Sequence, residues 1–193
     1  ISSSGHTNLY LGRVSGGDDK KAVKSRTDFL NLGFYLPLAQ KLCDILGDLS
    51  TGQSVIDAGC GEGYYSNMIA KNIGASVFGF DLSKEAIISA SRSAKRQGIS
   101  NANFFVGGIY DLPVKEDSAD AVVNIFAPCA EKEFSRILKM GGRLVVVTAG
   151  KNHLLGLKRA VYETVYTNEA RADMPENMKL IESFNLSYNI EIE

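Results

Sequence analysis

The feature that most constrains this chain is a glycine-rich turn directly after a short apolar run. The segment Val55–Gly63 is apolar as far as Asp57 and then carries glycines at alternate positions, Gly59, Gly61 and Gly63. Glycine tolerates a positive φ and leaves no Cβ atom between the backbone and a ligand. The pattern predicts a buried strand that turns tightly into a helix and holds a ligand at the turn.

A second acidic residue follows at a spacing that fits such a turn. Asp81 ends the apolar run Phe78–Phe80 and lies 24 residues after Asp57 (81 − 57). At about this distance the second strand of a βαβ unit offers a carboxylate to a ribose diol. Dinucleotides and S-adenosylmethionine both contain such a diol. An acid directly before the glycines would repel a pyrophosphate, whereas Asp57 would attract the ammonium of S-adenosylmethionine. The sequence therefore favours S-adenosylmethionine, with a glycine turn that binds no ligand as the alternative.

Apolar and amphipathic segments alternate along most of the chain. We expect two helices before the turn, one from Asp19 to about Leu32 and one that begins near Pro37. Strands are expected over 54–57, 76–81, 103–107, 120–125 and 142–148, and further helices over 64–72, 84–97, 129–138 and 154–165. This alternation is typical of a doubly wound, mainly parallel α/β sheet, whose ligands bind at the carboxyl ends of the strands.

The end of the chain changes its period and predicts two closing strands, around Leu180 and over 186–192, because apolar and polar residues alternate there. The expected sheet therefore has seven strands. We divide the chain into residues 1–50, an irregular lead-in and two helices that cover the ligand site, and residues 51–193, the ligand-binding domain.

Composition argues against several classes of protein. The 193 residues carry a net charge of −1, and neither a signal peptide nor an apolar run of the ~20 residues needed for a membrane span is present. We therefore expect a cytoplasmic protein without a membrane partner. Three widely spaced cysteines argue against a disulfide framework, and no metal ligands are assigned. Two basic clusters stand out against the near-neutral charge: Lys20, Lys21, Lys24 and Arg26, and Lys151, His153, Lys158 and Arg159. Solvated helix faces are an equal alternative for both clusters.

Taken together, the motifs resemble class I S-adenosylmethionine-dependent methyltransferases, which have a Rossmann-like seven-stranded sheet. The resemblance extends from the glycine turn to about Thr148. It rests on that turn and on the segments Gly79–Ser83, Asp111–Pro113 and Ile137–Leu144. It implies S-adenosylmethionine as the cofactor.

A narrower resemblance lies outside that core. Lys24–Leu38, Ile125–Cys129 and Gly150–Lys158 are similar to segments of bacterial 23S ribosomal RNA guanine-N1 methyltransferases. This implies methyl transfer to N1 of a guanine, with ribosomal RNA as the partner. A homodimer is kept as a candidate assembly, since the sequence does not determine the oligomeric state. Family members usually begin with a small zinc module, which we expect, where it exists, to precede this chain. Arg26 is a candidate ligand of a cofactor carboxylate or an RNA phosphate.

The resemblance also implies most of a cofactor site. Asp81 would accept both ribose hydroxyls, and Leu82 would pack on the adenine face. Gly108 stands where the superfamily often has an Asp for the adenine amino group, which leaves the backbone N–H of Ile109 for the ring. Tyr35 would approach the sulfonium from the N-terminal helices. The other expected cofactor residues are Asp57, Gly59, Gly61, Gly63 and Asn124.

The substrate is expected after the fourth strand. Asn124 can hydrogen-bond the base edge, Phe126 can stack on the base, and His153 could take a proton, although no residue is assigned as the general base. Pro128–Cys129 also matches cytosine carbon-5 methyltransferases, which use the thiolate as a nucleophile. The guanine-N1 family carries the same Ala-Pro-Cys, so this pair does not separate the two. A small-molecule methyltransferase and a non-catalytic cofactor-binding module remain as alternatives.

Overall fold

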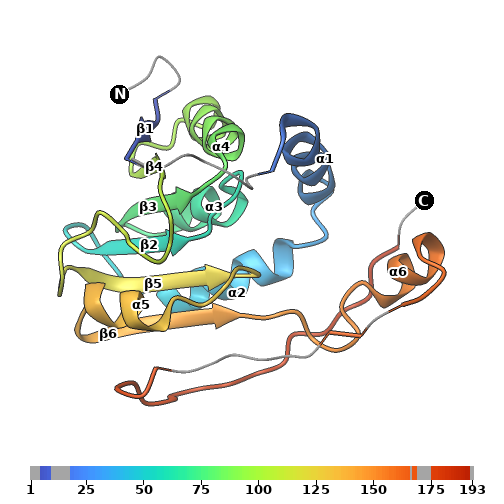
Figure 1. The fold of residues 1–193 in the computed structure, drawn as a ribbon. Coiled ribbons are helices and arrows are strands. Elements are labelled where there is room, and N and C mark those ends of the chain that lie inside the picture. Colours follow the sequence, from blue (N-terminus) through green and yellow to red (C-terminus); the bar gives the residue numbers. More distant parts are fainter. Residues whose placement is uncertain (1–4, 10–17, 166, 169–174, 192–193) are drawn as a thin grey trace.

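A parallel β-sheet forms the centre of the computed structural model, which describes residues 5–9, 18–165, 167–168 and 175–191. Six strands lie in the order β1-β4-β3-β2-β5-β6 (Figure 1). The strands are β1 (Thr7–Asn8), β2 (Ser54–Ala58), β3 (Ser76–Asp81), β4 (Ala102–Val106), β5 (Ala119–Ile125) and β6 (Leu138–Val147). The helices are α1 (Lys20–Asn31), α2 (Leu36–Leu46), α3 (Tyr64–Asn72), α4 (Lys84–Arg96), α5 (Glu131–Ile137) and α6 (Leu155–Val161).

Helices cover both faces of the sheet, as a doubly wound fold requires. Successive side chains of a strand point to opposite faces, so neighbours in β2 enter different cores. Val55 packs in a core with α2 and α3, and α4 covers the same face beside β4. Ile56 packs on the other face, against Phe134 and Ile137 of α5. The predicted α/β architecture is confirmed.

The strand order places a topological switch point beside β2. From β2 the chain moves outward to β3 and β4, and it then returns to β5 and β6 on the other side of β2. Every strand pair is parallel. In open parallel sheets, the crevice at the carboxyl ends of the strands on either side of such a point is the usual binding position.

The predicted elements between residues 19 and 165 are confirmed, with two boundary shifts of four residues: α6 ends at Val161, before the predicted end at residue 165, and β6 starts early. The Asp19 side chain caps α1 by accepting a hydrogen bond from the Ala22 N–H, at 2.8 Å. The second shift concerns β6, which begins at Leu138, before the predicted start at residue 142. Gly141 has a φ of +78°, and the pairing with β5 shifts register in this region. The glycines therefore lie within an irregular strand and do not separate it from the helix.

The N-terminal residues contain a strand that the sequence did not predict. Thr7–Asn8 pair in parallel with β4, and the Leu9 N–H donates to the Val106 carbonyl at 3.0 Å. Two residues are too short to show a period in the sequence. This part of the expected irregular lead-in is therefore an edge strand of the sheet.

The two predicted closing strands are not found. The described residues 175–191 contain no strand, and position 192 lies outside the described part. The sheet therefore has six described strands, and the expected seven are not confirmed. Asn177 accepts a hydrogen bond from Ser135 of α5 at 2.9 Å, whereas Phe184 lies under Lys41 of α2. Alternation favours an extended chain, but a strand also needs a hydrogen-bonded neighbour, which this segment lacks among the described residues.

Candidate active site

The glycine turn is held against the end of β3. The N–H groups of Gly59 and Cys60 both donate to the Phe80 carbonyl, at 2.9 and 3.0 Å. The Gly61 N–H donates to Asp81 Oδ2 at 2.9 Å. The two motifs recognised separately in the sequence therefore form one structural unit at the switch point.

The three glycines of the turn have different surroundings, although each has a positive φ. A Cβ atom on Gly59 would lie 2.7 Å from the Cβ of Ala127, and one on Gly63 would lie 2.7 Å from the Cβ of Ala90. A Cβ atom on Gly61 would meet only the guanidinium of Arg26, at 3.4 Å. Packing within the protein therefore explains why Gly59 and Gly63 lack a side chain. Gly61, in contrast, faces a side chain that can move.

Asp81 is anchored by backbone groups and keeps acceptor capacity. Its Oδ2 accepts from Gly61, and its Oδ1 accepts from the Ser83 N–H at 2.7 Å. A carboxylate offers about four acceptor positions, so positions remain for a ligand. The next side chain, Leu82, is 38% exposed. Gly108 and the partly buried Ile109 follow the neighbouring strand β4, so the residues predicted to hold the adenosine lie at the ends of adjacent strands.

Asp57 is buried beneath the turn. Its carboxylate accepts a hydrogen bond from the Ser66 hydroxyl at 2.5 Å. Burial raises the pKa of Asp57 to about 7, and the nearby charge of Asp81 acts in the same direction. The two carboxylates therefore differ in character, since Asp57 is enclosed by protein and Asp81 is only partly buried.

Three of the predicted site residues form one aromatic cluster. The Tyr35 hydroxyl is hydrogen-bonded to His153 Nε2 at 2.8 Å. Phe126 stacks on His153 with the ring centroids 5.2 Å apart, and it meets Tyr35 edge-on. Phe126 is 42% exposed and has a φ of +53°, which a residue without glycine's freedom rarely adopts. The structure thus joins the start of α2, the end of β5 and the segment after β6 at one place.

The chemistry of this cluster follows from its burial. Burial raises the pKa of Tyr35 to about 12, so its hydroxyl keeps its proton at neutral pH. Burial and the nearby charge of Lys158 lower the pKa of His153. A neutral imidazole can accept a proton. The cluster therefore combines an exposed aromatic face with a candidate proton acceptor.

Asn124 lies below this surface. It is fully buried, and its Nδ2 donates to the carbonyl groups of Ala58 and Pro128 at 3.0 and 3.1 Å. Its Oδ1 is buried without a hydrogen-bond partner among the described residues. In the structure Asn124 thus fastens the end of β2 to the loop after β5. Contact of Asn124 with a substrate or cofactor stays a prediction.

Sequence reasoning missed two residues that organise the site. Glu62 is a nearly buried carboxylate within the glycine turn, and Arg26 of α1 donates to it at 2.6 Å. Ser83 caps α4 and donates from its hydroxyl to the Asp18 carbonyl at 2.9 Å. A charged residue between two glycines was the available signal for Glu62. The partners of both residues could be identified only from the fold.

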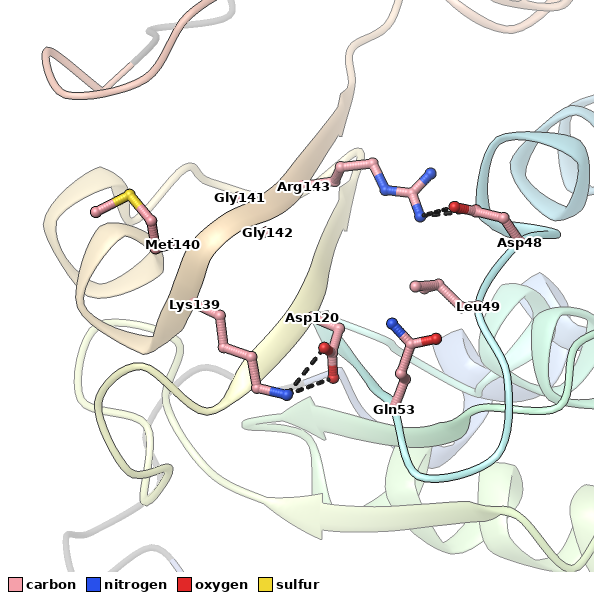
Figure 2. A pocket seen from close by; sticks show the side chains of 9 residues that line it. All are labelled: Asp48, Leu49, Gln53, Asp120, Lys139, Met140, Gly141, Gly142 and Arg143. Atoms are coloured by element: carbon pink, nitrogen blue, oxygen red, sulfur yellow. Dashed lines mark hydrogen bonds and ion pairs between the residues drawn. The ribbon is translucent and has the colours of Figure 1, made fainter.

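A separate polar pocket lies at the opposite edge of the sheet, where β5 and β6 begin (Figure 2). Its volume is about 290 Å³. Lys139 pairs with Asp120 at 2.8 Å, and Arg143 pairs with Asp48 at 2.7 Å. The four charges therefore neutralise one another, and none of the predicted site residues lines this pocket.

Two further properties concern the described residues only. None of their helices is both long and apolar enough to cross a bilayer. They contain no cluster of three or more His, Cys, Asp or Glu residues that could hold a metal ion.

The sheet order, the glycine turn fixed to Asp81 and the aromatic cluster at the switch point define a Rossmann-like α/β domain with its site at the carboxyl edge. Within this class, the sequence matches the methyltransferase domain over residues 49–186. The chain belongs to this family.

Individual relatives agree with the resemblance seen in the sequence. A Bacillus subtilis protein named as a candidate 23S rRNA guanine-N1 methyltransferase is 26% identical over 185 residues, covering 90% of this chain and 64% of the relative. The 23S rRNA (guanine(748)-N(1))-methyltransferase of Streptomyces fradiae is 29% identical over 167 residues, covering 83% and 58%. The chain therefore spans about three fifths of the length of these curated relatives.

A solved structure also resembles the fold. It is geranyl diphosphate C-methyltransferase from Streptomyces coelicolor A3(2), in complex with Mg2+, geranyl diphosphate and S-adenosyl-L-homocysteine. It is 27% identical, with a TM-score of 0.54, and the match covers 70% of this chain and 52% of that one. Methyltransferases that act on small molecules therefore share this fold.

Proposed function

We propose that this chain uses S-adenosylmethionine to methylate N1 of a guanine in 23S ribosomal RNA. The observation that carries the proposal is the aromatic cluster, in which an exposed Phe126 ring stacks on His153 beside the glycine turn. Such a ring offers a planar base a stacking surface, worth about 1–3 kcal/mol per base in single-stranded nucleic acid complexes. The names of the relatives from Bacillus subtilis and Streptomyces fradiae support the same substrate.

The residues present fit S-adenosylmethionine. Gly61 provides a turn position without a Cβ atom, and Asp81 keeps acceptor positions for a ribose diol. Leu82 and the backbone of Gly108 and Ile109 would border the adenine, and Tyr35 would face the sulfonium. When bound, S-adenosylmethionine supplies the methyl group as an electrophile.

The protein's own contribution is positioning and proton transfer. Phe126 would orient the guanine ring, and positioning of this kind supplies a large part of the rate in transfer reactions. N1 of guanine carries a proton at neutral pH, so that proton must leave as N1 reacts. Burial lowers the pKa of His153. In the tautomer whose Nε2–H donates to the Tyr35 hydroxyl, Nδ1 of His153 would be the proton acceptor.

The charges near the cluster support a nucleic-acid substrate. Lys151 and Arg159 are exposed and form no ion pair within the described residues, whereas Lys158 donates to Asn168. Exposed cations beside the methyl-transfer site would bind phosphate groups. We also propose a cytoplasmic location, because ribosomal RNA is the proposed partner.

The proposal can be tested with 23S ribosomal RNA that lacks guanine-N1 methylation. The protein is incubated with this RNA and S-adenosylmethionine labelled in the methyl group, and the product is analysed by nucleoside mass spectrometry and primer extension. We expect 1-methylguanosine at a single position, where the methyl group blocks base pairing. Phe126→Ala should lower the yield strongly, whereas Phe184→Ala, which removes an exposed ring on the C-terminal segment, should leave it unchanged.

Two results would contradict the proposal. Labelled RNA without 1-methylguanosine would mean that another atom or base is the target. Cofactor binding without any RNA labelling would favour a small-molecule substrate, the alternative raised by the geranyl diphosphate C-methyltransferase fold.

A further inference from the structure

Arg26 is directed from α1 onto the glycine turn. Its Nε donates to Glu62 at 2.6 Å, and its Nη1 is paired with the Asp18 carboxylate. Its Nη2 lies 3.4 Å from the position that a Cβ atom would take on Gly61. Nη2 forms no hydrogen bond within the part of the chain that the structure describes. Two of the three guanidinium nitrogens are therefore fixed, and the third faces the turn.

The two carboxylates around Arg26 restrict which ligand its third nitrogen can take. Asp18 and Glu62 together outweigh the single positive charge of Arg26 by one negative charge. The side chain of Arg26 is 41% exposed and therefore accessible. An RNA strand that approached it would, however, be repelled by both carboxylates. A small zwitterion fits better, because its ammonium can meet the acidic surroundings while its carboxylate meets the guanidinium.

Resting on the proposed cofactor, we infer that Arg26 Nη2 binds the carboxylate of the methionine part of S-adenosylmethionine. Glu62 is a positioning residue in this arrangement, since its bond to Nε holds the guanidinium over Gly61. Arg26 would thereby recognise the one end of the cofactor that Asp81 and Leu82 do not reach. A planar guanidinium suits a carboxylate geometrically, and a lysine would not reproduce this fixed orientation.

The test compares two ligands that differ by this carboxylate. Isothermal titration calorimetry measures the affinity of the chain for S-adenosylmethionine and for decarboxylated S-adenosylmethionine. We expect the wild type to prefer S-adenosylmethionine. Arg26→Gln should weaken the binding of S-adenosylmethionine by about 10- to 100-fold, the range expected for hydrogen bonds to charged groups. It should change the affinity for the decarboxylated ligand by less than about twofold.

Two further variants control for structural effects. Lys24→Ala removes another cation of α1, which pairs only with the exposed Asp28, and it should leave both affinities unchanged. Arg26→Gln leaves Glu62 without its charged partner, so the double variant Arg26→Gln with Glu62→Gln removes the unpaired charge. It should show the same selective loss, with a thermal unfolding midpoint close to that of the wild type.

The possible failures are distinguishable. An equal loss of affinity for both ligands in Arg26→Gln would show that Arg26 acts only by holding α1. Unchanged affinities together with reduced RNA methylation would assign Arg26 to an RNA phosphate. A wild-type chain that binds neither ligand would refute the proposed cofactor and this inference with it, whereas tight binding of both without discrimination would refute this inference alone.

Discussion

Three glycine-to-alanine substitutions can separate the roles of positive φ, packing and ligand contact. Gly98, Gly61 and Gly63 have φ values of +69°, +54° and +74°. Nothing lies within 4 Å of a Cβ atom on Gly98, whereas one on Gly63 would lie 2.7 Å from Ala90 and 2.9 Å from Phe104. The left-handed conformation costs an alanine roughly 1–2 kcal/mol, and overpacking adds about 1–3 kcal/mol.

We therefore expect Gly98→Ala and Gly61→Ala to lose similar stability, about 1–2 kcal/mol each. Gly63→Ala should lose about 1–3 kcal/mol more. The alanine also restricts the unfolded chain, but this effect is similar at all three positions and cancels in the comparison. Urea unfolding followed by circular dichroism measures the differences, provided that the m-values agree.

Calorimetry with S-adenosylmethionine completes the comparison. Gly61→Ala should weaken binding although its stability matches that of Gly98→Ala, because the new methyl group enters the space beside Arg26. The reasoning is refuted if Gly63→Ala is no less stable than Gly98→Ala. It is also refuted if Gly61→Ala binds the cofactor as tightly as the wild type.

Four further predictions concern single roles in the site. Asp57 has a pKa raised to about 7 in the folded protein. The stability of the wild type should therefore fall relative to that of Asp57→Asn as the pH rises from about 4 to 7, by up to about 4 kcal/mol. Urea unfolding of both proteins at both pH values measures this difference. Asp81→Ala should weaken the binding of S-adenosylmethionine by about 1.5–3 kcal/mol, as measured by calorimetry. An unchanged affinity would show that Asp81 is not part of the cofactor site. Cys129→Ser should keep most RNA methylation, whereas complete loss together with a covalent adduct on 5-fluorocytosine RNA would favour carbon-5 chemistry. Lys158→Glu combined with Arg159→Glu should reduce RNA methylation at low salt but leave cofactor affinity unchanged; activity equal to the wild type across a salt series would contradict an RNA-binding role.

The parts of the fold that the sequence predicted are those that local patterns determine. The strand from Ser54 to Ala58 is a buried apolar run that ends in a glycine turn, and both signals are contained in a few neighbouring residues. The start of α1 near Asp19 was predicted for the same reason, since the cap Asp19 and its partner Ala22 are only three positions apart. Such features need no knowledge of the tertiary structure.

The remaining parts depend on residues far apart in the chain. The hydrogen bond between Tyr35 and His153 spans 118 positions, and it arises only because α2 and the segment after β6 meet at the switch point. Glu62 was not recognised because its role depends on Arg26 of α1, which is 36 positions away in the chain. The C-terminal alternation predicted extended backbone, but it could not show whether a neighbouring strand would accept the hydrogen bonds.

The C-terminal segment also bears on how this domain behaves at high concentration. β6 pairs with β5 along one side, and its other side meets no strand among the described residues. A free strand edge can recruit a second chain and start aggregation. The segment 175–191 is linked to α5 through Asn177 and to α2 through Phe184, and it passes on the β6 side of the domain (Figure 1). Because its cited contacts are with α5 and α2, a variant that loses them should release the segment from the β6 side of the domain and leave this edge more accessible to intermolecular pairing.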